Sequence, residues 1–428
     1  MRNININVEH VTRLEGHGNI VVNVKEGRIE ECMWKVVEAP RFFEAFVRGR
    51  SYQELAHITS RICGICSIGH TLASLKATEA AMGIEVSAQT KLLRRILIQG
   101  ENLQSHILHA YFLVAPDLVG APSVFPLVAT HPEVVLRALR MKKLANDLCD
   151  IFGGRTVHPI TPAVGGFTKL PEIKEIKAIR QRLVEALPDV EATLALFKTL
   201  TIPQFNRETE YIALTSGEEY ALYDGQIGST DAGVTAVANY RAWTNEYLVP
   251  QSTAKYAKNR RASYLVGALA RFNLNHRQLS PLAKKAAADL GITAPCHNPF
   301  MNTVAQVVEA VHAAEELIRL IDELLATGLK EENLQVTPKA GTGAGAVDVP
   351  RGILFHEYTY DDKGICREAN CIIPTNQNHA NIQLDMEALL PLLMDKPEEE
   401  IRLRLEMLVR AYDPCISCST HLLDVRFV

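Results

Sequence analysis

Apolar and polar residues alternate along the first forty residues of the chain. The pattern holds over residues 3–8, over 18–25 and over 31–37. Alternation with a period of two is typical of strands that bury one face. The polar stretch Lys25–Arg28, which contains a glycine, predicts a turn between two of these strands. We therefore expect short antiparallel strands in an N-terminal region over residues 1–40.

Beyond residue 40 the apolar positions recur with helical spacing. The clearest stripe lies within residues 88–115 and consists of Leu92, Leu93, Ile96, Leu97, Leu103, Ile107 and Leu108. A stripe of this kind predicts an amphipathic helix with one buried face. The same spacing predicts helices over residues 51–58, 69–82, 133–152, 172–198, 275–290, 303–328 and 386–411.

Two stretches lack either period. Residues 202–260 are rich in Gly, Thr, Tyr and Asp and predict a small sheet or a lid on the helices, whereas 329–385 predict a Gly-rich loop with short strands. The Gly-rich run at 341–347 lacks the Lys-Ser/Thr ending of a phosphate-binding loop, so it makes a weak nucleotide site. The expected fold class is mainly α, with a large helical core of long bundled helices and peripheral antiparallel β-structure.

Composition fits one large folded unit. The 428 residues are 47% hydrophobic and 22% charged, which leaves ample apolar material for a buried core. We expect a single domain over residues 1–428 in four parts. These parts are the β region at 1–40, a helical core at 41–200, a peripheral mixed region at 201–260, and a helical core with a C-terminal metal-binding segment at 261–428.

The charge balance and the hydropathy disfavour two kinds of partner. With 45 basic and 49 acidic residues, the net charge of −4 gives no basic field for nucleic acid. The chain has no apolar run of ~18 residues, as a transmembrane helix requires, and no signal-peptide core. We expect a cytoplasmic protein that binds neither nucleic acid nor a membrane.

Four of the nine cysteines form two Cys-x-x-Cys pairs near opposite ends of the chain, Cys63/Cys66 and Cys415/Cys418. An odd cysteine count without a secretory signal argues against a framework of disulfides, and the other five are expected to be buried apolar residues. A zinc ribbon closes only ~15–20 residues between its pairs, so this site must form after the whole core has folded.

Four thiolates make a soft ligand set that suits zinc, nickel, copper(I) or an iron–sulfur cluster. From the residues alone, structural zinc, a thiol–disulfide pair and a redox metal centre all stay open. Two pairs in a helical setting, rather than one pair in a βαβ unit, count against the thiol–disulfide interpretation. A redox metal centre is therefore favoured.

At this point the motifs resemble the large, catalytic subunit of [NiFe] hydrogenases, of the cytosolic type linked to NAD(P), to F420 or to heterodisulfide reductase. The resemblance covers nearly the whole chain, and its order of motifs is highly specific. The matching blocks are Arg13–His17, Arg61–Cys66 with His70, Gly154–Pro159 with Gly165 and Gly166, Val349–Gly352, Ile373–Thr375 and Asp413–His421.

The resemblance implies a nickel ion held by the thiolates of both pairs. Cys63 and Cys415 would bind nickel alone, whereas Cys66 and Cys418 would also bridge to an iron that carries carbon monoxide and cyanide. The implied reaction is the reversible conversion H2 ⇌ 2H+ + 2e−, with heterolytic cleavage of H2. No iron–sulfur cluster is expected in this chain.

The resemblance also implies roles for charged residues around the metals. Glu15 would relay protons from Cys415, because a carboxylate beside a metal thiolate both accepts and donates. Arg351 would point over the open metal face and pair with Asp117 or Asp413. The alternatives are a surface or ion-paired acid at Glu15 and a purely structural ion pair at Arg351.

Uncharged residues complete the implied surroundings of the metals. Pro350 precedes the arginine, and Pro374 and Thr375 would meet the cyanide ligands, with the Thr375 hydroxyl as a donor. His70 is expected to form hydrogen bonds beside the site rather than to ligate a metal.

A second, hard-metal site is also implied, for Mg2+ or Fe2+. Its expected ligands are Glu44, the backbone carbonyl at Ile372, and His421. Such a site would pin the C-terminal segment, because chain ends otherwise fray. Residues 422–428 follow the last motif, and we expect them to be retained rather than removed on maturation.

Electrons must leave a buried centre, so the resemblance implies partners. We expect an iron–sulfur small subunit, an electron-acceptor module of the NAD(P), F420 or heterodisulfide-reductase type, and hence a hetero-oligomer. The NAD(P)-linked branch is preferred. Two other functions stay open: an H2-sensing regulatory subunit with little turnover, and a structural metal-binding scaffold subunit.

Overall fold

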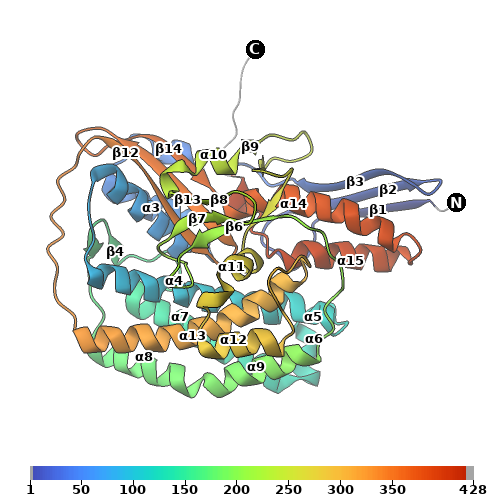
Figure 1. The fold of residues 1–428 in the computed structure, drawn as a ribbon, viewed down its shortest axis with the longest axis horizontal. Coiled ribbons are helices and arrows are strands. Elements are labelled where there is room, and N and C mark those ends of the chain that lie inside the picture. The colour runs from blue at the N-terminus through green and yellow to red at the C-terminus, as the bar shows by residue number, and fades with distance from the viewer. Residues whose placement is uncertain (1–2, 421–428) are drawn as a thin grey trace, which may run out of the picture.

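The computed structural model describes residues 3–420. Fifteen α-helices are distributed along this part of the chain (Figure 1). They are α1 (Phe43–Val47), α2 (Tyr52–Thr59), α3 (Ser67–Met82), α4 (Ala88–Leu108), α5 (Ala115–Leu118), α6 (Phe125–Thr130), α7 (Pro132–Gly153), α8 (Ile173–Glu185), α9 (Leu187–Thr199), α10 (Arg241–Thr244), α11 (Ala268–Asn275), α12 (Pro281–Asp289), α13 (Met301–Thr327), α14 (Pro374–Leu389) and α15 (Glu398–Ala411).

The strands of the described residues form five small sheets. They are β1 (Ile4–Val8), β2 (Gly18–Lys25), β3 (Arg28–Val36), β4 (Pro162–Ala163), β5 (Gly166–Phe167), β6 (Glu210–Thr215), β7 (Gln226–Ser229), β8 (Gly233–Thr235), β9 (Glu246–Tyr247), β10 (Tyr256–Ala257), β11 (Tyr264–Leu265), β12 (Gly341–Val349), β13 (Gly352–Tyr360) and β14 (Cys366–Ile372).

The N-terminal sheet confirms the period-two prediction. Strands β1, β2 and β3 pair antiparallel in that order, and Ile4, Ile6 and Val8 of β1 are buried on one face. The turn between β2 and β3 has Glu26 and Gly27 at positive φ, as a two-residue hairpin turn requires. In Figure 1 this sheet extends to the right, above α14 and α15.

The long helix α4 packs on both α7 and α13 in the helical layer (Figure 1). The apolar stripe predicted within residues 88–115 is buried there, and Leu93, Ile96 and Leu97 have no exposed surface. A π-helical segment (His109–Val114) continues α4 into α5. No helix within residues 3–420 is long and apolar enough to cross a membrane.

The sheet of β12, β13 and β14 is not peripheral, which corrects the expectation for this part of the β-structure. Most of β12 and β13 is buried, and β12 packs on α3. A Cβ at Gly343 would lie 2.1 Å from the Ala81 nitrogen, and one at Gly345 would lie 2.4 Å from the Ala77 nitrogen. The Gly-rich run at 341–347, for which the sequence predicts a loop, is therefore a strand whose glycines allow close approach to the helix backbone.

Three predicted helices are interrupted. The helix expected over 172–198 divides at Ala186, and Pro188 lies in the first turn of α9. The helix expected over 275–290 is a 3-10 turn (His276–Gln278) followed by α12. The single helix expected over 386–411 is also wrong, because α14 ends at Leu389 and α15 begins at Glu398. Proline favours the first turn of a helix, so it starts new helices at these breaks. Within 202–260, strands β6 to β8 form part of a small sheet, the first of the two expected alternatives.

Candidate metal centre

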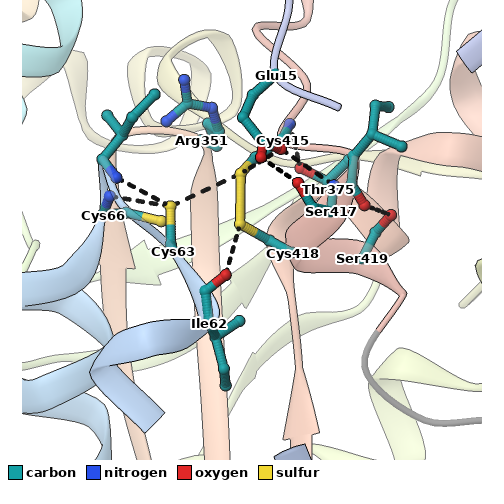
Figure 2. The surroundings of a disulfide bond; sticks show 12 residues. Glu15, Ile62, Cys63, Cys66, Arg351, Thr375, Cys415, Ser417, Cys418 and Ser419 are labelled. Atoms are coloured by element: carbon teal, nitrogen blue, oxygen red, sulfur yellow. Dashed lines mark hydrogen bonds between the residues drawn. A yellow bond between two sulfur atoms is a disulfide. The ribbon is translucent and has the colours of Figure 1, made fainter. Parts of the chain in front are cut away.

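The two Cys-x-x-Cys pairs meet in the interior of the protein. Cys63 follows a 3-10 turn (Ser60–Ile62), and Cys66 is the N-cap residue of α3. Cys415 and Cys418 follow α15, and each of the four is at most 3% exposed. The Sγ atoms of Cys63 and Cys415 are 3.6 Å apart, and the sulfurs of Cys63, Cys66 and Cys418 lie within 4.8 Å of one another (Figure 2).

Backbone pairing holds the C-terminal motif against the N-terminal segment. Glu15 and Cys415 form a parallel β-bridge, and the Ile416 N–H donates to the Glu15 carbonyl at 2.9 Å. Gly16 has φ +82°, and a Cβ there would lie 2.7 Å from the Ile416 Cβ. A glycine at this position therefore allows both the turn and the close approach.

Arg41 joins the two cysteine motifs. Its guanidinium donates to the Ile62 carbonyl at 2.6 Å and to the Ser417 carbonyl, and its backbone N–H donates to the Thr420 carbonyl at 2.7 Å. Ile62 precedes the first pair, and Ser417 lies within the second. One side chain thus fixes the distance between segments from opposite ends of the chain.

Cys415 and Cys418 are joined as a disulfide, and the other seven cysteines are free thiols (Figure 2). This bond lies within one motif and links no distant segments, so it is not the disulfide framework that the cysteine count argued against. The bond corresponds to the thiol–disulfide interpretation left open by the sequence, but at the Cys415/Cys418 pair alone. Both sulfurs must be reduced before they can act as thiolate ligands.

In the first cysteine pair, the surroundings favour the thiolate form of Cys63 over that of Cys66. Burial alone would raise the pKa of the Cys63 thiol, but the hydrogen bond from Cys66, the charge of Arg351 and backbone N–H groups lower that pKa to about 7. The N–H groups of Cys66 and Ile65 lie 3.1 and 3.3 Å from the Cys63 Sγ. Hydrogen bonding to Cys63 and burial raise the pKa of Cys66 well above its ordinary value.

Arg351 pairs with Asp413 and not with Asp117. Its Nε donates to the Asp413 carbonyl at 2.6 Å and its Nη2 to the Asp413 carboxylate at 2.7 Å. Burial alone would lower the pKa of the Arg351 guanidinium, but Asp413 and the sulfurs of Cys66 and Cys63 raise it, so the group stays charged. Nη1 has no hydrogen-bond partner among the described residues, which leaves a buried donor near the sulfurs (Figure 2).

Asp117 serves a different pair of arginines. Arg410 donates from Nε to its carboxylate at 2.7 Å, and Arg13 forms a second ion pair with it. Arg410 also donates to the Thr12 carbonyl at 3.1 Å. Asp117 therefore anchors the loop that carries Glu15. Of the two partners expected for Arg351, Asp413 is confirmed and Asp117 is wrong.

Glu15 reaches the sulfur cluster from that loop. Its Oε2 lies 3.2 Å from the Cys415 Sγ and accepts the Ser417 N–H at 3.0 Å, and its Oε1 accepts the Ser417 hydroxyl. The side chain is only partly buried. The carboxylate thus contacts a sulfur on one side and lies near the protein surface on the other.

The uncharged residues of the motifs surround the cysteines. The Cys415 N–H donates to the Thr375 Oγ1 at 3.0 Å, and Pro374 is the first residue of α14. The Pro350 carbonyl accepts from Arg271 at 3.0 Å. His70 is fully buried in α3, and its Nδ1 lies 3.1 Å from the Nε2 of His356.

The residues expected at a hard-metal site are described only in part. Glu44 is 1% exposed, and its Oε1 accepts the Cys371 N–H at 2.7 Å, directly beside Ile372 in β14. Glu44 and the Ile372 backbone are therefore neighbours. His421, the third expected ligand, lies outside the described residues.

The residues present fit a soft-metal centre. Four sulfurs converge in a buried volume, a carboxylate touches one of them, and a charged guanidinium with an unpartnered N–H lies beside them. Sulfur donors in such a setting suit nickel, iron or zinc. The charge of the thiolates would in turn partner the guanidinium.

Two contributors were missed at the level of sequence. Ser417 lies inside a quoted motif, but its contacts to Glu15 depend on the bridge between distant segments. Arg271 holds the backbone before Arg351 from a helix without any motif. A fully buried arginine carries no sequence signal of its partner, so neither contact was predictable from spacing.

Comparisons with known proteins agree over most of the chain. The family model described as "Nickel-dependent hydrogenase" matches residues 41–130 and 214–421, and a HoxL-like model matches residues 5–39. The chain is 33% identical to the alpha subunit of sulfhydrogenase 1 of Pyrococcus furiosus, covering 97% of each chain. It is 29% identical to one subunit of the F420-non-reducing hydrogenase of Methanothermobacter marburgensis, covering 98% of this chain and 95% of that one.

Solved structures share the fold. An NAD+-reducing [NiFe]-hydrogenase in the H2-reduced state superposes with a TM-score of 0.85 at 27% identity, over 98% of this chain and all of that one. A [NiFeSe]-hydrogenase of Dm. baculatum superposes with a TM-score of 0.78 at 25% identity over the same share of this chain.

Proposed function

The chain belongs to the nickel-dependent hydrogenase family, as the catalytic subunit of an oxidoreductase that acts on H2, and we propose that Cys63, Cys66, Cys415 and Cys418 hold its nickel–iron centre. The observation that carries this proposal is the convergence of the four sulfurs, with 3.6 Å between the Sγ atoms of Cys63 and Cys415. The reaction is H2 ⇌ 2H+ + 2e−.

The bound metals supply the cleavage of H2 into two protons and two electrons. Cys63, Cys66, Cys415 and Cys418 would hold nickel, and Cys66 and Cys418 would also hold an iron that carries carbon monoxide and cyanide. Shared thiolates would spread the change of charge over both metals, and an open position would distinguish this catalytic site from a structural one. The Cys415–Cys418 disulfide would have to be reduced before its sulfurs could bind the metals.

Glu15 accepts the proton released at the centre. Its Oε2 lies 3.2 Å from the Cys415 sulfur, which is within reach for direct transfer through an S–H group. The Ser417 N–H holds the same oxygen at 3.0 Å and so fixes its direction. Because Glu15 is partly exposed, it can pass the proton on to water.

Arg351 orients the small ligand at the open position. Its Nη1 donor is buried and has no partner among the described residues, while Asp413 holds the rest of the guanidinium. A fixed positive charge beside the sulfurs stabilises negative charge that develops during heterolytic cleavage. Pro374 and Thr375 would lie beside the iron ligands, because the Thr375 hydroxyl oxygen accepts the Cys415 N–H. Asp413 acts through Arg351.

We assign the hard-metal site to Glu44, the Ile372 carbonyl and His421, with Mg2+ or Fe2+ as the ion. The closeness of Glu44 to β14 supports this assignment, because its Oε1 already binds the adjacent Cys371 N–H. The two oxygen ligands, Glu44 and the Ile372 carbonyl, suit Mg2+.

Electrons leave through a separate iron–sulfur protein to a soluble acceptor, in a hetero-oligomer in the cytoplasm. The names of the relatives support a partner, since they are subunits of larger hydrogenases. The similarity to an NAD+-reducing enzyme and to a sulfhydrogenase supports NAD(P) as the acceptor. Assays of H2 oxidation by the purified complex with NAD+, NADP+ and F420 distinguish the acceptors.

The function is tested by metal content together with H2-dependent dye reduction. The purified complex should contain nickel and iron, reduce a viologen dye under H2 and show infrared bands of carbon monoxide and cyanide. Cys415→Ser should abolish dye reduction, whereas Cys296→Ser, a change at a partly exposed cysteine away from both pairs, should not. A complex that contains zinc alone and reduces no dye would refute the proposal.

A further inference from the structure

Arg271 in α11 uses every donor of its guanidinium. The side chain has no exposed surface, and all five of its N–H groups have an acceptor within 3.0 Å. Two of them grip the Glu309 carboxylate, at 2.7 and 2.6 Å. The other three go to three consecutive residues: the Asp348 carboxylate at 2.5 Å, the Val349 carbonyl at 2.7 Å and the Pro350 carbonyl at 3.0 Å.

The residue that follows this clamped segment is Arg351. Its backbone sits at the turn between β12 and β13, where Gly352 has φ +132°. A Cβ at Gly352 would lie 2.5 Å from the Val266 side chain, and one at Gly267 would lie 3.2 Å from the Arg351 carbonyl. The turn is therefore packed against Val266 and Gly267 and is also held by Arg271.

The far end of the clamp is itself fixed. Glu309 on α13 also lies 2.7 Å from the Nε2 of His106 on α4, and it accepts the Tyr220 hydroxyl at 2.6 Å. The carboxylate is thus held from three separate segments. A planar guanidinium with five directed donors transmits that fixed position to the Val349 and Pro350 carbonyls better than a lysine, whose three donors rotate freely.

We propose that Arg271 is a positioning residue for the hydrogenase reaction: it holds residues 348–350 so that the Arg351 guanidinium faces the sulfur cluster. This inference rests on the role given above to Arg351. The side-chain bonds to Asp413 fix one edge of that guanidinium, and the clamp on the preceding backbone fixes where the side chain starts. A shift of ~1 Å at a reacting group is enough to lower a rate about a hundred-fold.

A double-mutant cycle separates positioning from stability. Arg271→Lys keeps the buried charge opposite Glu309 and Asp348 but cannot reach both carbonyls. In the purified metal-loaded complex we expect it to lower turnover with a viologen dye by roughly ten- to a hundred-fold. In an Arg351→Lys background the same change should lower turnover less than two-fold, because the group that it positions is already gone.

The melting temperature supplies the second readout. Its decrease on Arg271→Lys should be the same in both backgrounds, since stability depends on the clamp and not on Arg351. Arg94→Lys is the matched control: Arg94 is fully buried, binds Glu79 at 2.6 and 2.8 Å and bonds a tyrosine hydroxyl and the Ala163 carbonyl. It should lower the melting temperature but show the same effect on turnover in both backgrounds.

A second variant guards against failure to fold. Glu309→Gln removes one of the two buried carboxylates around Arg271, while Asp348 still balances the charge. In the wild-type background it should lower turnover as Arg271→Lys does. In the Arg351→Lys background it should lower turnover less than two-fold. In the crystal structure of either variant complex, the 2.7 Å contact between Arg351 Nη2 and Asp413 should be lost or lengthened.

Two outcomes overturn the inference in different ways. Equal losses of turnover in both backgrounds, with Arg351 unmoved in the crystal, would make Arg271 a structural residue only. Full turnover of Arg351→Lys alone would remove the role of Arg351 itself, and with it the function that Arg271 is proposed to serve.

Discussion

The carboxylate of Glu15 connects two chemical environments. It touches the Cys415 sulfur, and it is held by the Ser417 N–H and hydroxyl. The loop that carries it is anchored by the Asp117 ion pairs with Arg13 and Arg410. A group with one side on a sulfur and the other near solvent is well arranged to carry protons.

Replacing Glu15 by Gln should therefore block proton transfer while leaving the metals bound. We expect dye-reduction turnover to fall by about 10²–10⁴-fold, the usual contribution of a positioned acid or base. Nickel and iron contents, measured by mass spectrometry, should stay at wild-type values. Glu26→Gln in the exposed β2–β3 turn is the control and should keep full turnover. Wild-type turnover of the Glu15 variant would exclude it from the proton route.

The buried, neutral ring of His379 should lower the free energy of unfolding as the pH falls into the mildly acidic range. It is fully buried between Trp34 and Ser419, and desolvation lowers its pKa from 6.5 to about 3. Between these two values the unfolded chain binds a proton that the folded chain does not, so the free energy of unfolding falls as the pH falls. One such site contributes a slope of about 1.4 kcal/mol per pH unit.

Urea unfolding of the complex between pH 6.5 and 4 tests this. His379→Gln should reduce the slope by about that amount, whereas His57→Gln, a change at an exposed histidine, should keep the wild-type slope. An unchanged slope in the His379 variant would mean that its ring takes up a proton in the folded state.

The site residues divide by how local their signals are. Glu15, Arg351 and the four cysteines could be named in advance because each sits in a short motif that resembles a known family. The partner of Arg351 could not, because Asp117 and Asp413 were both candidates and only tertiary packing pairs Asp413 with Arg351 and Asp117 with Arg410. The spacing of residues along the chain does not predict ion pairs between residues that are far apart in sequence.

At the scale of elements, the contact between α3 and β12 determines how the first cysteine pair is supported. Helix α3 begins at Ser67, directly after Cys66, and runs along β12, which leads into Arg351. Glycines on the strand and alanines on the helix bring the two backbones together. Any side chain inserted between them would push the two halves of the site apart.

Gly343→Ala should be destabilising for this reason. Its new Cβ would lie 2.1 Å from the Ala81 nitrogen, a backbone atom that cannot turn away. We expect a loss of roughly 1–3 kcal/mol in the free energy of unfolding, as in other overpacked cores. Gly217→Ala, where nothing lies within 4 Å of the new Cβ, should change it little. Equal stability of the two variants in calorimetry would contradict the close helix–strand contact.

Helices and strands with a clear period were predictable, and segments with mixed signals were not. The stripe around Leu93 and the alternation around Ile6 gave the right element types. Helix α14 was missed at its start because Pro374 resembles a loop residue, although proline suits the first turn of a helix. The sequence predicts a loop where β12 lies, because glycines are typical of loops. Here the glycines let the strand approach the backbone of α3, which the sequence pattern does not reveal.

At the scale of the whole molecule, the cysteine cluster brings the two ends of the described chain together. Residues 13–17, the first cysteine pair and the last motif come from segments that meet only in the folded state. Arg41 bridges the two motifs through the Ile62 and Ser417 carbonyls. In the proposed centre, folding and metal binding should therefore be coupled, since its four sulfurs come from both cysteine pairs.

Arg41→Ala tests this coupling. Loss of two charge-assisted hydrogen bonds should lower the free energy of unfolding by about 3 kcal/mol and reduce the nickel retained after dialysis against a chelator. Arg48→Ala, at an exposed position next to the same short helix α1, should keep both values. Full nickel retention in the Arg41 variant would show that the two motifs hold together without this bridge.

Nickel K-edge X-ray absorption of the purified complex tests the central claim most directly. Four sulfur ligands are expected around nickel, and Cys63→Ser should remove one of them or release the metal. A nickel ion surrounded by nitrogen and oxygen, or zinc in its place, would contradict the account.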